Sequence, residues 1–584
     1  MCGFFGSFNI KRKLNLNLLK HRGPDSFGYY EDEYLYLGFC RLKIIDLSDK
    51  ANQPMEFDNL VMAFNGEIYN FLELKRELKE YEFKTNSDSE VLLYTFHKFG
   101  ILKALSKIVG MFSIVLYDKN EKKIYLIRDR AGIKPLYYAF ENNGIIFSSE
   151  IKPIFEAIKR KDINERAILN HIVFLFNFDD ETAFKGIYRL KPASILEFSN
   201  NGIKNYYYWQ YEFKNEINNL ELAKKEFIEI FDEVIRSQLI SDVEVSLFLS
   251  SGIDSSLIAL FSSKYKKLKT FSLIYKEKHI SKDIINDEFY YAKKLSQKLN
   301  FEIEGIEFDF NEEILNKFVY YIEEPIGDSA GISTYLMCDY YKSRVILSGM
   351  GGDELFGGYP RYKAYLIYEK FKFLPLNNIY FPNYFGRISR DFEKLKRVWS
   401  KPYYYYLAYY TDDEIKNLFK IEYNPFLEIK KIFNELEGNS YEKMLLFDFK
   451  TFLPFHNLIY SDRLSMAKSV ELRVPFLDDR IIEFSKKLNY HLKIEKKLLK
   501  EVINDYYPEI SKRKKRGFGG PIRGWLYENQ KFVRNEIEKL KKLDFLNFEK
   551  IIEISNEEFQ GKKFNYLNVF EFLILSRWIE IFGF

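Results

Sequence analysis

The alternation of short apolar segments with helical periods between residues 222 and 347 constrains the fold most. A helical pattern over 222–238 leads into an apolar segment at 243–249, then a loop of small residues and another helical pattern. Further strand-like segments lie at 268–273 and 344–347. Strands separated by helices predict a parallel sheet, so we expect an α/β doubly wound domain here. Helical patterning from about residue 359 to the end predicts a helical C-terminal extension.

The first 200 or so residues follow a different pattern. Short apolar or alternating segments at 60–64, 111–117, 124–127 and 145–147 are separated by Gly, Asn and Asp, and helical periods occur at 71–79 and 90–99. This mixture predicts an α+β domain of stacked layers. A polar stretch at 200–218 separates the two patterns. We therefore expect two domains, 1–205 and 206–584, although 584 residues would permit up to about four.

Composition and charge argue against several classes of protein. The chain has 88 Lys and Arg against 84 Asp and Glu, a net charge of +4, whereas a dedicated nucleic-acid binder needs a clustered basic surface. No apolar run approaches the roughly 18 residues of a membrane-spanning helix. We expect neither a nucleic-acid nor a membrane partner. Three cysteines, Cys2, Cys40 and Cys338, exclude a disulfide framework and predict a cytoplasmic location.

Cys2 is the first candidate for chemistry. Removal of Met1 would leave a free α-amino group beside the thiol, which places a nucleophile and a base on one residue. Taken alone, a cysteine here is typical of a small buried hydrophobe. Glycines at 3 and 6 follow, and then the segments His21-Arg22-Gly23-Pro24-Asp25, Arg41-Leu42-Lys43-Ile44-Ile45-Asp46, Asn65-Gly66-Glu67 and Ser87-Asp88-Ser89-Glu90. Together and in this order, these segments resemble the class II glutamine amidotransferases, whose fold is that of the N-terminal nucleophile hydrolases.

The resemblance assigns roles to individual residues. It implies that Cys2 forms a γ-glutamyl thioester and releases ammonia, and that Asn65 and Gly66 form the oxyanion hole. It implies that Arg41 pairs with the α-carboxylate of glutamine. Glutamine binding would also involve Asn65, with Glu67 and Asp88 holding the α-ammonium group. Cys40 stands where relatives often carry His, and we interpret it as a tolerated change rather than a second nucleophile.

A second motif follows the segment at 243–249. It reads Leu249-Ser250-Ser251-Gly252-Ile253-Asp254-Ser255-Ser256. Small residues let backbone N–H groups surround phosphate oxygens at a helix N-terminus. Asp254 would repel phosphate unless Mg²⁺ lies between them. Alone, the segment could be an ordinary Ser-rich turn; no Walker A motif occurs, and Gly349 to Glu354 lacks the last glycine of a dinucleotide fingerprint.

This motif resembles the PP-loop of ATP pyrophosphatases, with Ser251 in place of the first glycine. Ser348-Gly349-Met350-Gly351-Gly352-Asp353-Glu354, continuing to Gly357-Gly358-Tyr359, resembles the partner motif. Further matches are Asp287-Glu288, Glu324-Pro325 with Asp328, and the runs 462–467 and 469–478. By resemblance, Asp254 and Asp353 hold Mg²⁺, and ATP contacts Leu249, Ser250, Ser251, Gly252, Asp254, Ser255, Ser256, Ser272, Ser348 and Gly349.

The segment 512–516 is the only dense basic run. Alone, it would be a solvated loop or a weak nucleic-acid patch. It resembles the Arg-x-Lys-x-Gly-Phe loop of the same family, which assigns to Lys515 the stabilisation of charge at an adenylate.

Nearly the whole chain resembles the asparagine synthetase-like amidotransferases. The resemblance implies that MgATP activates a carboxylate as an acyl-adenylate and that ammonia made at Cys2 converts it to an amide. Glutamine, ATP and aspartate or another carboxylate would be the substrates, and a homodimer is left open. Asparagine-forming relatives commonly have an acid three residues before the second metal aspartate, but this chain has Met350, so another acid such as a uronic-acid sugar is an alternative. A PP-loop enzyme acting on tRNA and a non-catalytic glutamine sensor fit the motifs less well.

Overall fold

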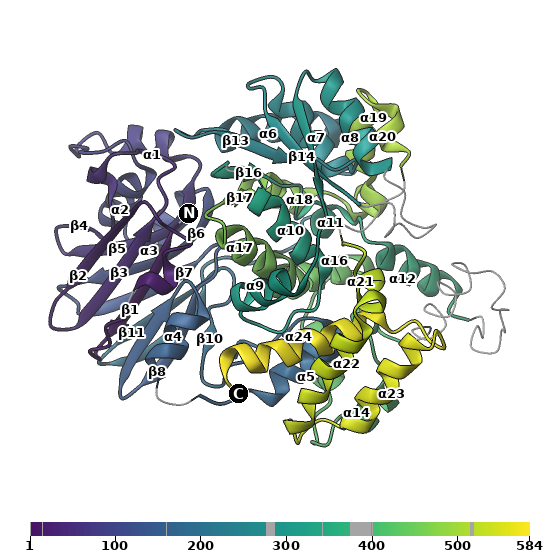
Figure 1. Cartoon of the computed structure of the whole chain (residues 1–584). Helices are drawn as coiled ribbons and strands as arrows, with labels where there is room; N and C mark the ends of the chain where they lie inside the picture. The colour runs from purple at the N-terminus through teal and green to yellow at the C-terminus, as the bar shows by residue number, and fades with distance from the viewer. Residues whose placement is uncertain are drawn as a thin grey trace.

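The computed structural model describes residues 2–14, 16–158, 161–275, 287–340, 343–373, 399, 401–513 and 519–584. Figure 1 shows two layers of antiparallel sheet in the N-terminal part and a parallel sheet surrounded by helices in the remainder.

Two six-stranded antiparallel sheets form the N-terminal domain. The first has the order β10-β8-β9-β1-β3-β2, built from Tyr188–Arg189, Tyr137–Glu141, Gly144–Ser148, Gly3–Phe8, Leu35–Arg41 and Ser26–Glu31. The second has the order β12-β11-β7-β6-β5-β4, built from Gly202–Tyr207, Ser194–Ser199, Lys123–Arg128, Gly110–Asp118, Leu60–Ile68 and Met55–Phe57. Phe4 and Leu37 of the first sheet and Val61 and Val115 of the second share one buried core between the sheets. This arrangement confirms the α+β layered prediction.

Helices cover the outer faces of both sheets. On the second sheet, α1 (Phe71–Glu77), α2 (Asp88–Phe99) and α3 (Ile101–Lys107) bury the other face of β5, as Met62 and Phe64 pack in a core with Leu92. On the first sheet, α4 (Ile151–Ala157) packs on β8 and β9, and η1 (Leu16–Leu19) packs on β3. The four N-terminal strand segments predicted from sequence all lie within β5, β6, β7 and β9.

The second domain is built on a five-stranded parallel sheet of order β15-β14-β13-β16-β17. Its strands are Glu302–Glu307, Lys269–Ile274, Val245–Phe248, Val345–Leu347 and Glu471–Arg473. The chain adds β14 and β15 on one side of β13 and then β16 and β17 on the other, which confirms the doubly wound prediction. The order reverses between β13 and β16, and a crevice at the carboxyl ends of such strands is where doubly wound folds bind ligands.

Helices connect and extend this sheet. Those among the sheet strands are α6 (Leu220–Gln238), α7 (Ile253–Ser262), α8 (Asp287–Lys298), α9 (Glu312–Ile322), α10 (Ser329–Tyr340), α11 (Gly352–Phe356), α12 (Pro360–Phe371), η6 (Tyr403–Leu407), α14 (Asp412–Leu418), α15 (Pro425–Asn434), α16 (Ser440–Lys450), the π-helical turn η7 (Leu453–Asn457) and α17 (Leu458–Met466). After β17 follow η8 (Pro475–Leu477), α18 (Asp479–Lys487), η9 (Tyr490–Leu492), η10 (Ile494–Lys496), α19 (Lys497–Asn504), α20 (Pro508–Ser511), α21 (Ile522–Glu528), α22 (Gln530–Glu538), η11 (Lys539–Lys542), α23 (Phe548–Phe559) and α24 (Tyr566–Phe582). Among the described residues after 359, β17 is the only strand, as the helical pattern predicts.

Two features bear on how the chain divides. Strand β12, the last of the N-terminal sheets, runs across the expected boundary between residues 205 and 206, and that boundary stays a prediction. Helix α5 (Glu165–Phe174) belongs to the first 205 residues but packs against α15 and α24. The N-terminus lies on the side of its domain that faces the C-terminal domain (Figure 1).

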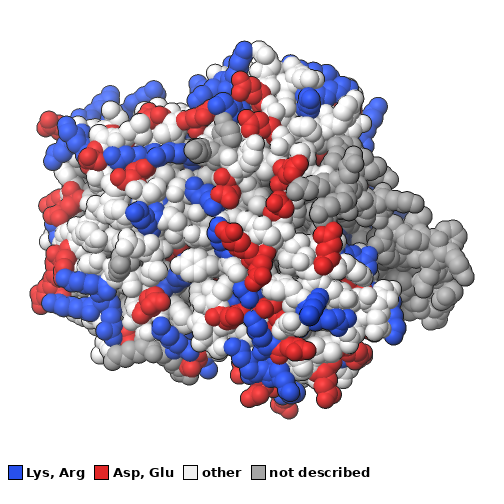
Figure 2. All heavy atoms as spheres, in the orientation of Figure 1, with Lys and Arg blue, Asp and Glu red and all other residues white. Residues whose placement is uncertain are grey.

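The surface shows no segregation of charge on the face in Figure 2, where acidic and basic side chains intermingle over both domains. Within the described residues, no helix combines the length and the apolar character that crossing a membrane requires.

Candidate active site

Cys2 lies directly before β1 and reaches the edge of the space between the two sheets. Its backbone nitrogen donates to Asn65 Oδ1 on β5 at 3.1 Å, so a residue of the first sheet meets one of the second. Only 8% of Cys2 is exposed and Asn65 is fully buried. Because Asn65 Oδ1 accepts from the Cys2 nitrogen, Asn65 Nδ2 is the atom of this amide that can donate a hydrogen bond to a ligand.

Gly66 follows Asn65 and is required by the pairing of β5 with β6. A Cβ atom at Gly66 would lie 2.1 Å from the carbonyl oxygen of Met111 on β6. Burial raises the pKa of the Cys2 thiol, while the backbone at Leu42 and the Arg41 guanidinium act in the opposite direction. The structure therefore brings Cys2, Asn65, Gly66 and Arg41 into one site.

Two acids lie buried next to this group. Glu67 is 4% exposed and Asp88, at the start of α2, is 5% exposed. Burial raises the pKa of Asp88 to about 6, and burial together with the nearby carboxylates raises the pKa of Glu67 well above its usual value. Asp88 Oδ2 accepts from the backbone N–H of Ile68 at 3.0 Å. Two buried carboxylates side by side favour a cationic ligand group.

The Arg41 guanidinium holds the loop that follows β3. Its Nη1 donates to Ser48 O at 2.7 Å and to Asn52 Oδ1 at 3.0 Å, and its Nη2 donates to Ile45 O at 3.3 Å and to Asp46 O. Arg41 thus shapes the wall of the site through these contacts.

Cys40 has no exposed surface, and its pKa is raised to about 12, chiefly by burial. Its Sγ donates to Leu16 O at 3.6 Å. The burial of Cys40 and its raised pKa agree with the interpretation that it packs in the core and is not a second nucleophile.

The loop after β13 has the compact form expected of a phosphate-binding turn. Ser250 Oγ accepts from the backbone N–H of Gly252 at 3.1 Å and contacts Ser255 Oγ at 2.9 Å. Helix α7 then starts at Ile253, with Gly252 as its N-cap. Leu249 N–H donates to Phe271 O at 2.8 Å, next to Ser272 on β14. Strand β13 and helix α7 thus present the loop at the carboxyl edge of the sheet.

The loop after β16 closes onto the first one. A Cβ at Gly349 would lie 2.9 Å from the Cβ of Asp254, and one at Gly352 would lie 2.6 Å from Asp254 Oδ1. Asp353 lies in the first turn of α11. The structure therefore brings together the two aspartates predicted as metal ligands, although they are far apart in the sequence.

Lys496 links the two aspartates and is a candidate site residue that the sequence reasoning missed. Its Nζ contacts Asp254 Oδ2 and lies 2.6 Å from Asp353 Oδ1. Burial lowers the pKa of Lys496, but the two carboxylates outweigh burial and raise it. Glu495 and Lys496 have positive φ angles of 53° and 59°, an uncommon conformation for residues other than glycine that clusters at functional sites. No motif in the sequence reports this geometry.

Lys515 lies outside the described residues. Gly519, just after that segment, packs against the start of α10, because a Cβ there would lie 2.4 Å from Ser329 Oγ. Asp328 precedes this helix and lies 3.4 Å from His456 Nε2 of the π-helical turn η7.

Met350 faces the same group of elements. Ser461 Oγ on α17 donates to Met350 Sδ at 3.2 Å. Asn457 Nδ2 donates to Glu354 Oε1 at 2.8 Å. Helix α17 and its preceding turn therefore form the wall opposite the second loop.

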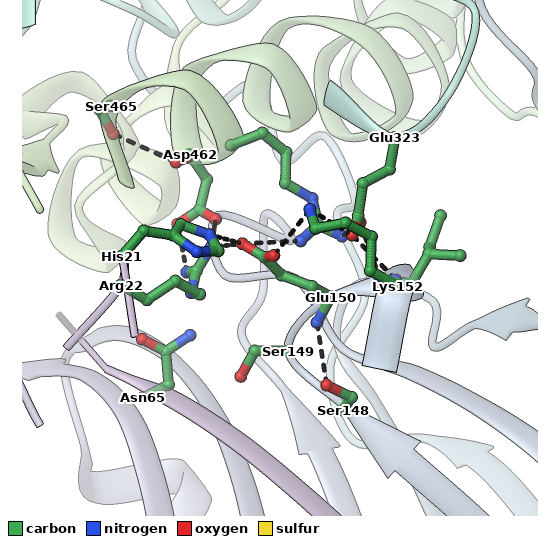
Figure 3. Close-up of polar contacts among 12 residues, drawn as sticks. His21, Arg22, Asn65, Ser148, Ser149, Glu150, Lys152, Glu323, Asp462 and Ser465 are labelled. Carbon is green, nitrogen blue, oxygen red and sulfur yellow. Dashed lines mark hydrogen bonds and ion pairs between the residues drawn. The ribbon is translucent and has the colours of Figure 1, made fainter. Parts of the chain in front are cut away.

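A buried ionic network joins the two domains, and Figure 3 shows its side chains. Arg22, fully buried, donates from Nε to Cys2 O at 3.0 Å. Its Nη1 and Nη2 donate to the Asp462 carboxylate on α17 at 2.8 and 3.2 Å. The backbone of Cys2 is therefore tied through one side chain to the second domain.

The same network continues at Glu323, which accepts from the backbone N–H of Ile151 at 2.8 Å and of Lys152 at 2.9 Å. Glu323 also lies 2.8 Å from Lys152 Nζ and 2.8 Å from Arg463 Nη2. Figure 3 shows these side chains converging from both domains. Such buried charges are tolerated because each has a partner.

Comparison with known families agrees with this two-site architecture. Residues 1–209 match the glutamine amidotransferase domain, and residues 226–580 match the asparagine synthase family. The chain is a member of the asparagine synthase family. It joins a glutaminase of N-terminal nucleophile fold to an ATP pyrophosphatase domain and is a glutamine-dependent, ATP-driven, amide-forming ligase.

Curated relatives match most of the chain, and one matches all of it. A protein of Bacillus subtilis named asparagine synthetase [glutamine-hydrolyzing] 1 is 32% identical, covering 100% of this chain and 97% of the relative. A putative asparagine synthetase [glutamine-hydrolyzing] 2 of Methanocaldococcus jannaschii is 32% identical over 62% of this chain and 76% of the relative. A putative asparagine synthetase of Mycobacterium bovis is 27% identical over 87% of this chain and 84% of the relative.

Proposed function

We propose that this asparagine synthase family member converts aspartate to asparagine, with nitrogen from glutamine bound at Cys2 and energy from ATP bound between the loops after β13 and β16. Two features of the same chain support the proposal. Asp254 and Asp353 both contact the Lys496 ammonium at the point where the strand order of the parallel sheet reverses, and the backbone of Cys2 is hydrogen-bonded to Asn65. Either site alone could serve another reaction, whereas two such sites joined by a buried interface suit the transfer of nitrogen from glutamine to an activated acid.

In the glutaminase half, the Cys2 sulfur attacks the carboxamide carbon of glutamine. Once Met1 is removed, the α-amino group of Cys2 accepts the thiol proton and passes it to the leaving ammonia. Asn65 Nδ2 and the Gly66 N–H stabilise the oxyanion. Water then hydrolyses the thioester to glutamate.

Glutamine is held by its two charged ends. Arg41 is assigned to the α-carboxylate. Its two terminal nitrogens donate to the loop after β3, so binding glutamine requires Arg41 to exchange part of these hydrogen bonds for the carboxylate oxygens. Glu67 and Asp88 bind the α-ammonium group. Both acids are buried, and although Glu67 Oε2 accepts from Arg473 Nη2 at 3.0 Å, Glu67 Oε1 has no hydrogen-bond partner among the described residues.

In the synthetase half, the two loops hold the phosphates of ATP with the backbone N–H groups and serine hydroxyls of residues 249–256 and 348–349. The carboxylates of Asp254 and Asp353 fit Mg²⁺, since both are hard oxygen donors that already reach a single cation. Bound there, Mg²⁺ would neutralise phosphate charge. Lys496 supplies a second positive charge, and we assign to Lys515 the charge that develops at the adenylate.

The acid then attacks the α-phosphate, pyrophosphate leaves, and ammonia displaces AMP from the acyl-adenylate to form the amide. Ammonia reacts only while unprotonated, so transfer across the closed interface at Arg22 and Asp462 protects it from water.

Aspartate is the first candidate acid because Asp328 and His456 lie together and offer acceptors to an α-ammonium group. His456 is followed by Asn457, whose amide donates to Glu354 of the second motif. Met350 favours a second candidate, a carboxylic acid without an ammonium group at that position, such as a uronic-acid sugar. The thioether of Met350 cannot accept a proton from an amine or pair with a cation.

The experiment is a panel of acids incubated with ATP, Mg²⁺ and glutamine labelled with ¹⁵N in the amide. AMP release is measured for each acid, and the product is identified by mass spectrometry. We expect labelled asparagine as the main product. AMP release with a sugar acid but not with aspartate would replace the first candidate by the second, and no AMP release with any acid would contradict both.

A further inference from the structure

Arg473 lies at the end of β17, between the two candidate sites. It is fully buried, and its side chain is fixed on three sides. Nε donates to Glu471 Oε1 at 2.6 Å, and Nη1 donates to the carbonyl oxygens of Gln238 at 2.6 Å and Ile240 at 2.7 Å. A guanidinium held in this way has a single orientation.

The main chain of Arg473 supports the nucleotide loop. β16 and β17 are parallel neighbours in which Leu347 pairs with Arg473. The backbone N–H of Ser348, the first residue of the second loop, donates to Arg473 O at 2.9 Å. The next residue, Gly349, packs on Asp254. A ligand that shifted Ser348 would therefore also act on the main chain of Arg473.

The side chain of Arg473 reaches the glutamine site. Nη2 donates to Glu67 Oε2 at 3.0 Å across the domain interface. Glu67 follows Gly66 of the expected oxyanion hole, and its Oε1 is buried without a hydrogen-bond partner among the described residues. Glu67 is buried close to Asp88 and Glu471, whose charges favour its protonated form, and Arg473 opposes them.

We propose that Arg473 is a positioning residue that couples the two sites, so that occupancy of the nucleotide loops changes the affinity of the amidotransferase site for glutamine. The change passes from Ser348 to the Arg473 main chain and then through the guanidinium to the carboxylate of Glu67. The connection has only one residue between the two sites, although Glu67 and Arg473 are 406 positions apart in the sequence. This inference rests on the proposed function, because it needs glutamine in one site and ATP in the other.

The coupling is testable at equilibrium in the full-length Cys2→Ala variant, which should bind glutamine without turnover. Calorimetric titration with glutamine is performed alone and with saturating Mg²⁺ and an ATP analogue bearing a methylene bridge between the α- and β-phosphates. We expect the glutamine Kd to change by about fivefold or more. By linkage, glutamine must change the Kd of the analogue by the same factor.

Adding Arg473→Lys to Cys2→Ala keeps a positive charge but removes the planar guanidinium. We expect the ATP analogue then to leave the glutamine Kd nearly unchanged. Arg130→Lys is the control, because Arg130 also forms an ion pair across the interface, with Asp479 at 2.5 Å, although Arg130 is only partly buried. We expect the ATP analogue to change the glutamine Kd of this variant by the full factor. Glu67→Gln is a second variant should Arg473→Lys fail to fold, and it should also reduce the factor.

The coupling would be overturned if glutamine and the analogue bind Cys2→Ala independently. It would also be overturned if the analogue still changes the glutamine Kd in full when Arg473→Lys or Glu67→Gln is added. Neither result would affect the proposed function. Loss of the factor in Arg130→Lys as well would also overturn the coupling, since any disturbance of the interface would then suffice. If glutamine or the analogue does not bind Cys2→Ala at all, the proposed function itself fails.

Discussion

At the scale of single residues, Lys496 illustrates how one charge organises a site. Two carboxylates that face each other repel unless a cation lies between them, and the Lys496 ammonium occupies that place at 2.6 Å from Asp353 Oδ1. Both side chains are partly buried, with 16% and 18% exposed, so the cation between Asp254 and Asp353 offsets their mutual repulsion where solvent screens it only in part. We therefore include Lys496 in the proposed nucleotide site, together with the motif residues.

Replacing Lys496 by Met should lower ammonia-dependent AMP formation by about 10²–10³-fold, because a positioned charge at the phosphates is lost. The rate is measured with ammonia so that the glutaminase half does not contribute. Lys497→Met, at the exposed neighbouring position, is the control and should stay within about twofold of the wild type. Equal rates in the two variants would contradict the role of Lys496.

Asp88 should give the proposed glutamine site a dependence on pH. Its pKa is raised to about 6, so the carboxylate becomes protonated as the pH falls through that value and no longer attracts the α-ammonium group. We expect kcat/KM for glutamine to fall below pH 6 by up to about tenfold per pH unit. The Asp88→Asn variant should be weak at all pH values and lack this inflection. An inflection that persists in Asp88→Asn would assign it to another group.

At the scale of elements, the carboxyl edge of the parallel sheet depends on glycines that let two loops meet. A Cβ at Gly358 would lie 1.9 Å from Asp353 Oδ1 and 2.3 Å from Lys496 Cε. The strand order, the two loops and this glycine together decide where the aspartates lie.

Gly358→Ala should therefore strongly reduce the rate of AMP formation while the protein stays folded at the assay temperature, since the added methyl group displaces Asp353 and Lys496. Rates and thermal unfolding are measured on the same preparation. Gly561→Ala is the control: with φ at +68° and open space around it, its cost should be about 1–3 kcal/mol of stability with unchanged activity. A fully active Gly358→Ala would show that the aspartates need not hold this geometry.

The sequence predicts those elements whose apolar pattern is uninterrupted. Strands β5, β6, β13 and β16 carry such patterns, and both loops follow strands as predicted. Strand β15 does not stand out in the sequence, because Glu302–Glu307 contains three acids and a glycine and only two apolar residues. Strand β17 does not stand out because two of its three residues are charged, although all three are buried.

The site divides in the same way. Cys2, Asn65, Asp254 and Asp353 belong to motifs with fixed spacing and could be named in advance. Lys496 and Arg473 act through tertiary contacts, with Asp353 and Glu67 respectively. Local pattern carries no information on which distant carboxylate a buried cation will meet, so their contacts needed the structure.

At the scale of the whole molecule, the buried ionic network makes the interface specific. Arg22 and Asp462 are 0% and 4% exposed and meet at 2.8 Å, with Lys134 Nζ 3.8 Å from the same carboxylate. Charges buried in pairs add little net stability, but removing one partner leaves the other uncompensated.

Asp462→Leu should destabilise the chain by about 3–5 kcal/mol, because Arg22 and Lys134 lose their shared partner. Denaturant unfolding measures this. Asp413→Leu, at a side chain 91% exposed on α14, should change stability by less than about 0.5 kcal/mol. A loss at position 462 no larger than at 413 would mean that the network does not hold the domains together.

The central claim is that one chain makes ammonia at Cys2 and uses it at the loops after β13 and β16. The most direct test compares AMP formation by Cys2→Ala with glutamine and with ammonia as the nitrogen source. We predict that glutamine-dependent formation is lost, while ammonia-dependent formation stays within about twofold of the wild type, because removing the nucleophile leaves the second site intact. Unchanged glutamine-dependent formation in Cys2→Ala would contradict the assignment of the nucleophile, and loss of both activities would contradict the division of the reaction between two sites.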